Sequence, residues 1–295
     1  MNKLSVQNLV RNYSIETTVP QAERVERFSD IVPAATRLYI AHIPGTNPQD
    51  TAKLAARLRN EGMEPVPHVV GRRIASLAAL DEILARLSGE AGVTQVLVVA
   101  GDNATPEGAL TSGLEIIESG LLEKYNIRTI GVAGHPEGHK EVADPILRDA
   151  LKRKNAYAER TGANVYVVTQ FAFSADPVIA WERSHSADIG KLPVTVGLPG
   201  LATAKTLLKY AMDCGVGASL TAFSKRYASL TKLLTVSAPD DSIVALARYK
   251  ETTPESHFNA LHFFPFGGFK KTADWANKVV AGNFELTDDG GLKVE

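Results

Sequence analysis

The stretch Gln95-Val-Leu-Val-Val-Ala-Gly-Asp-Asn103 decides the fold. Residues 96–99 are all apolar, so this run leaves no polar face for solvent. Such a run is typical of a strand that is buried on both sides in a parallel sheet. The sequence then changes abruptly to Gly, Asp and Asn, which are residues of turns and loops. The stretch therefore predicts a buried parallel strand whose carboxyl end presents polar side chains.

Similar short apolar runs recur along the whole chain, and most are rich in the Val, Ile, Tyr and Phe that strands prefer. They are residues 13–17, 38–43, 65–70, 95–100, 128–133, 165–170, 193–196 and 260–264. Because helical patterns separate nearly all of them, we predict an α/β fold, a single (β/α)8 TIM barrel over residues 1–295. The long interval 197–259 is expected to hold extra helices before the last strand. A doubly wound sheet is disfavoured, since no Gly-x-Gly-x-x-Gly follows the first strand.

The helical patterns have recognisable stripes and ends. One apolar stripe, with spacings of three and four, consists of Ile74, Leu77, Leu80, Leu84 and Leu87. A second helix is predicted to start at Pro106-Glu107. Helix ends are predicted at four glycines, Gly62, Gly89, Gly92 and Gly162.

Composition excludes several classes of protein. The chain has 295 residues, with 32 Lys and Arg against 33 Asp and Glu, so its net charge of -1 gives no electrostatic reason to bind nucleic acid. No apolar run approaches the roughly 18 residues that span a bilayer, and the N-terminus lacks the pattern of a signal peptide. We expect a cytoplasmic protein without a membrane partner. The one cysteine, Cys214, is expected to pack within a helix over 204–214.

In a TIM barrel, function is expected where strands end and βα loops begin. Six of the eight predicted strands end in polar or ionisable residues: Glu16, His42, His68, Asp102, Gly134-His135-Pro-Glu-Gly-His139 and Gln170. His135 and His139 have metal-like spacing, but Pro136 and Gly138 between them exclude the helix that would align them, so no metal is expected. There is no Gly-x-Ser-x-Gly nucleophile and no strand-end lysine. This combination indicates proton handling beside a cofactor that carries the chemistry.

At this point several motifs match a known family. They are Ser14-Ile15-Glu16, Pro67-His68, Ala100-Gly101-Asp102, the 132–139 loop, Leu151-Lys152-Arg153-Lys154, Gly162-Ala163-Asn164 with Thr169-Gln170-Phe171, and Leu261-His262-Phe263. In this order and spacing the chain resembles the methylenetetrahydrofolate reductase family of flavin-dependent barrels.

The resemblance implies an oxidoreductase that interconverts 5,10-methylenetetrahydrofolate and 5-methyltetrahydrofolate by hydride transfer through a noncovalent FAD, with NAD(P)H as electron donor. It implies that Glu16 is the general acid and that Asp102 lies near both flavin and pterin. Gln170 would hydrogen-bond the folate and Tyr210 would stack on bound ligand. Residues implied to contact or support the flavin are His42, His68, Asp102, Gly134, His135, His139 and Lys154, with Lys154 on the FAD pyrophosphate. A homo-oligomer is also implied.

The chain departs from the family pattern at several positions. Ala100 stands where an arginine often precedes Gly-Asp, and His135 where the family has tyrosine. The family's Phe-Phe-Pro-Pro after the glutamate is replaced by Thr17-Thr18-Val19-Pro20. A hydroxyl residue expected on the second strand is replaced near Ile40, and the Thr-Leu-Asn-Arg after the last strand is replaced by Pro265-Phe266-Gly267-Gly268. Both reaction directions remain open, including oxidation in a demethylation pathway. A second possibility is also open: a folate-binding barrel without flavin that acts in methyl transfer or as a noncatalytic subunit.

Overall fold

The computed structural model describes residues 2–214, 216, 218–226, 233–288 and 290–295. Eight parallel strands form a closed barrel in the order β1-β10-β7-β6-β5-β4-β3-β2. They are β1 (Ser14–Thr17), β2 (Arg37–Ile40), β3 (Glu64–Val70), β4 (Gln95–Val99), β5 (Thr129–Gly134), β6 (Asn164–Thr169), β7 (Val194–Pro199) and β10 (Phe258–Phe264). Each coincides with one of the eight predicted runs, so the prediction of a (β/α)8 barrel is confirmed.

The chain divides into two compact units, which we describe one at a time. The β2–β5 unit comprises Glu16–Ala133 and Ala150–Val167. The β7–β10 unit comprises Met1–Ile15, Gly134–Asp149 and Val168–Glu295. Strand pairing inside each unit is parallel, for example Leu38 beside Pro65 in the first and His262 beside Gly197 in the second.

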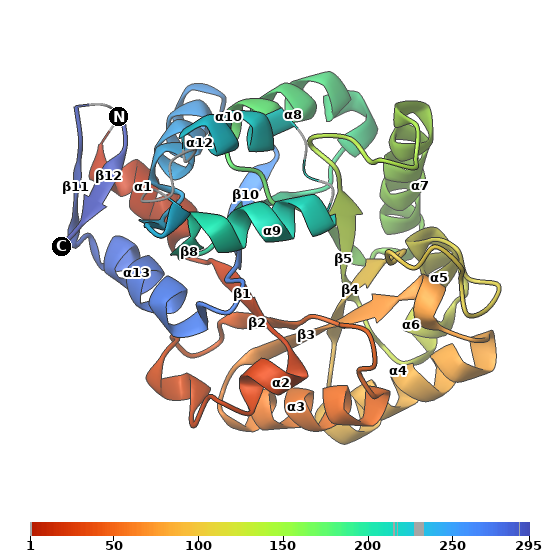
Figure 1. The fold of residues 1–295 in the computed structure, drawn as a ribbon. Helices are drawn as coiled ribbons and strands as arrows, with labels where there is room; N and C mark the ends of the chain where they lie inside the picture. The colour runs from red at the N-terminus through yellow and green to blue at the C-terminus, as the bar shows by residue number, and fades with distance from the viewer. Residues whose placement is uncertain (1, 215, 217, 227–232, 289) are drawn as a thin grey trace. The chain divides into compact units, whose positions relative to one another are not determined.

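In the β2–β5 unit, helices α3 (Pro48–Asn60) and α4 (Leu77–Ala91) lie side by side outside β2 and β3 (Figure 1). The predicted stripe of α4 is buried at Leu80, Leu84 and Leu87, while Leu77 is exposed. Ser76 caps the helix, because its hydroxyl accepts a hydrogen bond from the amide of Ala79. The short elements of this unit are α2 (Val19–Ala22), η1 (Phe28–Asp30), η2 (Gly71–Arg73), α5 (Gly113–Glu118) and α6 (Leu121–Lys124).

Two predictions about helix ends are wrong. The helix predicted to start at Pro106-Glu107 begins only at Gly113, because Ser112 and Glu115 form a capping box that satisfies its first amides. Gly89 lies inside α4, and Gly92 ends that helix in the left-handed conformation, with a φ of 58°. Gly62 and Gly162 follow the ends of α3 and α7 (Asp144–Thr161) with positive φ, as expected.

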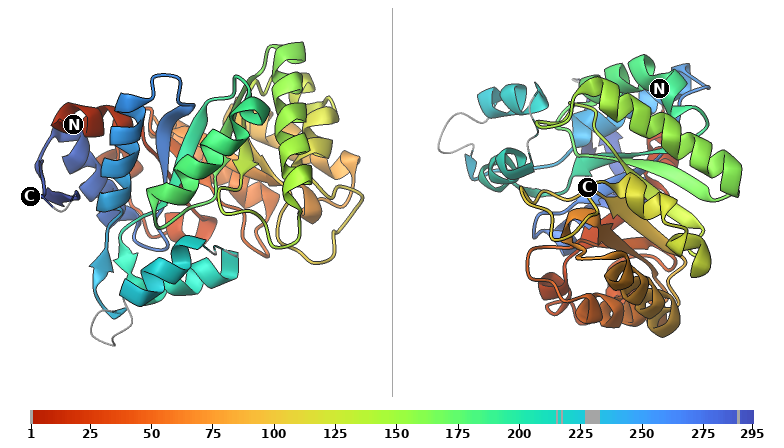
Figure 2. Two further views of the ribbon diagram at one scale, coloured as in Figure 1. Left: turned by 90° about the horizontal axis from the view of Figure 1, so that it is seen from above. Right: turned by 90° about the vertical axis from the view of Figure 1, so that its right-hand side faces the viewer.

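The β7–β10 unit contains the long interval before the last strand. Here β8 (Ala202–Thr203) pairs with β9 (Val236–Ser237), and α9 (Ala204–Cys214) and α10 (Ala218–Arg226) lie between them in sequence. Figure 2 shows these four elements projecting from the rest of the unit. The predicted extra helices are therefore present. Cys214 lies in the predicted helix but is exposed, so the expectation that it packs is wrong.

The remaining helices of this unit pack around its strands. They are α1 (Lys3–Val10), α8 (Ala175–Ile189), α12 (Asp240–Thr252) and α13 (Phe269–Ala281). A hairpin of β11 (Phe284–Leu286) and β12 (Leu292–Val294) follows α13 and was not predicted. Within the described ranges, no helix combines the length and the apolar character needed to cross a membrane.

Gly197, in β7, is packed too tightly to carry a side chain. A Cβ added at Gly197 would collide with the Thr169 carbonyl oxygen and would lie 2.8 Å from the Phe264 ring. We expect Gly197→Ala to lower the free energy of unfolding by about 1–3 kcal/mol. The control, Gly89→Ala, adds a methyl group to an open helix position and should raise it by about 0.5–1 kcal/mol. Urea denaturation measures both changes, and equal effects of the two substitutions would contradict this account of the packing.

Candidate active site

Asp102 follows β4 and is held by Arg73, an arginine that was not predicted from the sequence. Arg73 Nη2 donates to Asp102 Oδ1 at 2.7 Å. The guanidinium side chain is only 13% exposed, whereas the Asp102 side chain is 86% exposed. The hydrogen bond from Arg73 holds the pKa of Asp102 below its usual value, against a smaller opposing effect of burial. Asp102 is therefore a fixed anion at neutral pH.

The loop that carries Asp102 is fixed by the preceding βα connection. Arg72 Nε donates to the carbonyl oxygen of Asn103 at 2.7 Å, and its Nη2 donates to that of Ala104 at 2.8 Å. Gly101 adopts a φ of 101°, which permits the sharp turn after β4. The cation beside Asp102 comes from η2, which directly follows β3, while Ala100 stands where the resemblance implies an arginine. Arg72 and Arg73 directly follow Val70 and Gly71 in sequence, so the strand-end criterion could have found them.

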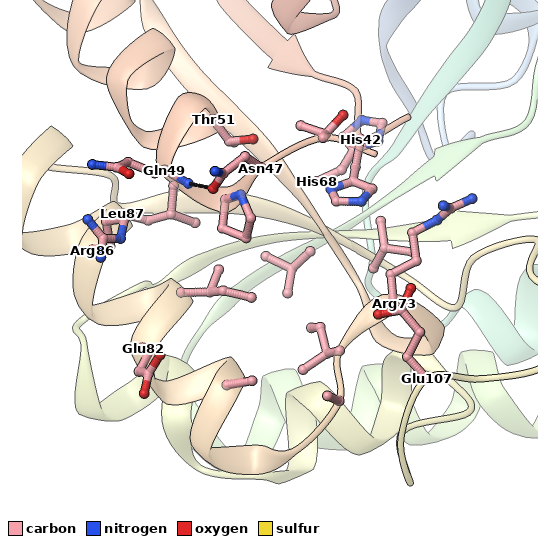
Figure 3. A pocket seen from close by; sticks show the side chains of 18 of the residues that line it. His42, Asn47, Gln49, Thr51, His68, Arg73, Glu82, Arg86, Leu87 and Glu107 are labelled. Carbon is pink, nitrogen blue, oxygen red and sulfur yellow. Dashed lines mark hydrogen bonds between the residues drawn. The ribbon is translucent and has the colours of Figure 1, made fainter. Parts of the chain in front are cut away.

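His42 and His68 line one cavity of about 540 Å³ in the β2–β5 unit. In Figure 3, His42, His68, Arg73 and Glu107 lie on one side of it. Burial lowers the pKa of His42, and the nearby Arg73 lowers it further, so this imidazole is neutral at pH 7. The His68 ring packs edge-on against Tyr39, with 6.2 Å between ring centroids. The structure thus brings His42 and His68 together with the residue that holds Asp102.

Lys154, on α7, is a half-buried cation. Its Nζ donates to the carbonyl oxygen of Ala133, at the end of β5, over 3.0 Å. No carboxylate pairs with it among the residues that the structure describes, and burial lowers its pKa to about 8. Arg153 beside it is committed elsewhere, because its guanidinium binds both carboxylate oxygens of Glu118. Lys154 therefore carries a desolvated charge that an anionic ligand would stabilise.

Glu16, the predicted general acid, lies on β1 and is half-buried. Its chain neighbours Ile15 and Thr17 are buried. Side chains alternate along a strand, so Glu16 lies on the opposite face from Ile15 and Thr17.

In the β7–β10 unit, Gln170 directly follows β6. Its Oε1 accepts a hydrogen bond from the amide of Phe171 at 3.0 Å, which fixes the side-chain amide. Its backbone amide donates to the carbonyl oxygen of Gly134 at 2.9 Å. Gln170 is half-buried, and its side-chain Nε2 has no partner within the described part of the chain. This geometry leaves the two N–H groups of Gln170 to donate to a ligand.

Tyr210, on α9, belongs to an aromatic cluster in the same unit. Its ring stacks on Phe266 with 4.4 Å between centroids and an interplanar angle of 22°. Phe266 in turn contacts Phe171 and Phe264. One face of Tyr210 is therefore occupied by Phe266, and a ligand can stack only on the other. Phe266 lies just beyond the carboxyl end of β10, in the Pro265-Phe266-Gly267-Gly268 stretch, and no stacking role was predicted for it from the sequence.

His135 and His139 lie in one turn of the β7–β10 unit. Their rings meet edge-to-face, with 5.3 Å between centroids. Gly138 has a φ of 78°, and its amide donates to the carbonyl oxygen of His135, which closes the turn. His139 Nδ1 accepts from the amide of Glu141 at 3.1 Å. Within the described residues, no three His, Cys, Asp or Glu side chains are arranged to hold a metal ion.

The fold and these residues define a class of protein: a (β/α)8 barrel with carboxylate, imidazole and amide side chains after its strands. The chain belongs to the methylenetetrahydrofolate reductase family, whose model matches residues 6–233. The resemblance drawn from the motifs is thereby confirmed.

Solved structures show the same fold. An uncharacterized protein from Clostridium thermocellum, described as binding two copies of 5-methyl-5,6,7,8-tetrahydrofolic acid, is similar with a TM-score of 0.57 and 13% identity over 90% of this chain and 97% of that one. A family 18 chitinase from Crocus vernus has a TM-score of 0.51 and 10% identity, covering 91% and 98%. At such identities, both likenesses concern the barrel alone.

Proposed function

We propose that this protein is an FAD-dependent oxidoreductase that interconverts 5,10-methylenetetrahydrofolate and 5-methyltetrahydrofolate. The observation that carries the proposal is the family match over residues 6–233, within which every proposed site residue lies. The folate bound by the Clostridium thermocellum protein supports a reduced folate as the ligand class. Family membership alone does not define an activity, so the individual residues must supply the chemistry.

The proposed folate chemistry uses Glu16, Asp102, Gln170 and Tyr210. Glu16 protonates the amine leaving group of the methylene bridge, which opens it to a reactive iminium ion. Asp102, held as an anion by Arg73, stabilises positive charge that develops on the pterin. Gln170 donates its free N–H groups to the folate, and Tyr210 stacks on the ligand with the face that Phe266 leaves open.

Lys154 fits the FAD that the family implies. A desolvated lysine without a carboxylate partner is suited to a phosphate, because a phosphate restores the lost counter-charge. We propose that Lys154 holds the FAD pyrophosphate and that His42, His68, Gly134, His135 and His139 contact or support the flavin. Bound FAD would supply the hydride-carrying ring. The protein's own residues orient the substrate, exclude water and move the proton at Glu16.

NAD(P)H is the proposed electron donor, and the absorption spectrum of the purified protein tests the proposal. We expect a yellow protein that releases FAD on denaturation. Anaerobic addition of NADH or NADPH, and separately of 5-methyltetrahydrofolate, should bleach the flavin band. The two additions identify the donor and the direction. A protein that does not bind added FAD, or whose bound FAD is bleached by neither reagent, would contradict the flavin-dependent function.

A second candidate function is a folate-binding protein without flavin, acting in methyl transfer or as a noncatalytic subunit. It is favoured by the engagement of Arg153 with both carboxylate oxygens of Glu118, which removes one cation of the Leu151-Lys152-Arg153-Lys154 motif from a bound phosphate. Colourless protein that binds 5-methyltetrahydrofolate in calorimetry would establish this alternative.

A further inference from the structure

The cavity of the β2–β5 unit extends beyond the residues used above. Besides His42 and His68, it is lined by the start of α3 and by one face of α4. Figure 3 shows Gln49, Glu82, Arg86 and Leu87 on the side opposite to His42, His68, Arg73 and Glu107. We call the part formed by Gln49, Ala79, Glu82, Ile83, Arg86 and Leu87 the outer end. None of these six residues has a role in the chemistry proposed above.

The outer end combines an apolar wall with a cation. Ala79, Ile83 and Leu87 are spaced by four residues along α4, so they form one apolar strip on the cavity. Arg86 lies on the same helix, and its side chain is 38% exposed. The whole cavity, about 540 Å³, is in the usual range for small-molecule sites, roughly 300–1,000 Å³. An apolar strip beside a cation suits a flat ring that is linked to a carboxylate.

Arg86 can bind such a carboxylate with little loss of other interactions. Its Nη1 donates to Glu90 at 2.7 Å, and Nε and Nη2 have no partner among the residues that the structure describes. The pair with Glu90 is exposed on both sides, and exposed pairs contribute little to stability. The side-chain amide of Gln49 adds a neutral donor. Glu82 is the one acidic group at the outer end, and it is exposed, so solvent screens its repulsion.

We propose that the outer end of this cavity binds the p-aminobenzoylglutamate half of a folate. The benzoyl ring packs on Ala79, Ile83 and Leu87, and a glutamate carboxylate reaches Arg86. The proposal rests on the proposed function in taking a folate as the ligand. The half-folate belongs either to the substrate, as its extended arm, or to a second folate molecule. The inner end of the same cavity contains Arg73, so an occupant lies next to the guanidinium that holds Asp102.

Calorimetry with two probes, 5-methyltetrahydrofolate and p-aminobenzoyl-L-glutamate, tests the proposal. Ala79→Trp fills the outer end, and its control, Ala78→Trp, places the same ring on the exposed neighbouring position, which does not line the cavity. Arg86→Gln removes the cation without filling the space, and keeps the test decisive if Ala79→Trp fails to fold. We expect Ala79→Trp and Arg86→Gln each to weaken p-aminobenzoylglutamate binding by about tenfold or more, and Ala78→Trp to leave it unchanged.

The stoichiometry of 5-methyltetrahydrofolate separates the two sources of the half-folate. Two molecules per chain, reduced to one by Ala79→Trp, identify a second folate; one molecule, bound more weakly by Ala79→Trp, identifies the arm of the substrate. One molecule whose affinity neither variant alters would overturn the cavity proposal and leave the proposed function intact. If the natural protein did not bind 5-methyltetrahydrofolate, the folate function would be refuted. If the natural protein bound neither 5-methyltetrahydrofolate nor p-aminobenzoyl-L-glutamate, both proposals would be overturned.

Discussion

Replacing Glu16 by Gln is expected to lower the rate of folate turnover by about 10²–10⁴-fold, the usual contribution of a positioned general acid. The amide has the shape of the carboxylic acid but cannot donate its proton to the amine leaving group. The half-buried position of Glu16 on β1 is kept by this substitution. Reduction of the enzyme by NADH involves no leaving amine, so its rate should stay within about twofold. Stopped-flow measurement of each half-reaction separately checks the result.

Glu23→Gln is the matched control for Glu16→Gln. Glu23 lies in the same unit at the end of α2 and is exposed, so its replacement should change neither half-reaction. If Glu16→Gln slowed both half-reactions equally, Glu16 would hold the structure of the site and would not act as the acid. If it slowed neither, another group would have to supply the proton.

Replacing Lys154 by Met is expected to weaken FAD binding by about 10–100-fold, because a charge-assisted contact to phosphate is lost. The same substitution should stabilise the unliganded protein at pH 7. The depressed pKa, about 8, corresponds to roughly 3 kcal/mol of unfavourable burial of the charge. Loss of the hydrogen bond to Ala133 offsets about 1 kcal/mol of the stability gained by removing the charge. We therefore expect a net gain of about 1–2 kcal/mol in urea denaturation.

The pH dependence of Lys154 has a definite sign. Below pH 8 the lysine is protonated in both the folded and the unfolded chain, so the full cost of its burial is present. Between pH 8 and its unfolded value, the unfolded chain binds more protons, and stability therefore rises with pH. The advantage of Lys154→Met should accordingly be largest below pH 8 and fade above it. FAD affinity of the natural protein should fall as pH rises through 8, because the uncharged amine must take up a proton to pair with phosphate.

Lys152→Met is the control for Lys154→Met, since Lys152 lies on the same helix and is exposed. It should change neither FAD affinity nor its pH dependence. A Lys154→Met variant that is less stable than the natural protein and binds FAD normally would show that Lys154 serves only to hold the carbonyl end of β5.

The barrel was predictable because its signals are local. A strand buried on both sides needs a continuous apolar run, as at 96–99, and its helix needs a stripe at the spacing of Leu80, Leu84 and Leu87. The change from apolar to polar residues marks where each strand ends, which placed His42, Asp102 and Gln170 after strands. The failures at Pro106 and Gly89 are local as well: several residues could begin or end these helices, and the capping hydrogen bonds of Ser112 and the left-handed Gly92 decided between them.

The sequence by itself determined the fold, the family and the strand-end positions of the candidate site. Only the tertiary structure decided the electrostatics: Arg73 holds Asp102, Arg153 is committed to Glu118, and Lys154 has no counter-charge in the described part of the chain. The cavity against α3 and α4 likewise arises from packing between separate elements. The physical reason is range. Periodicity and capping act over a few residues, whereas charge pairing, desolvation and empty space depend on groups that only folding brings together.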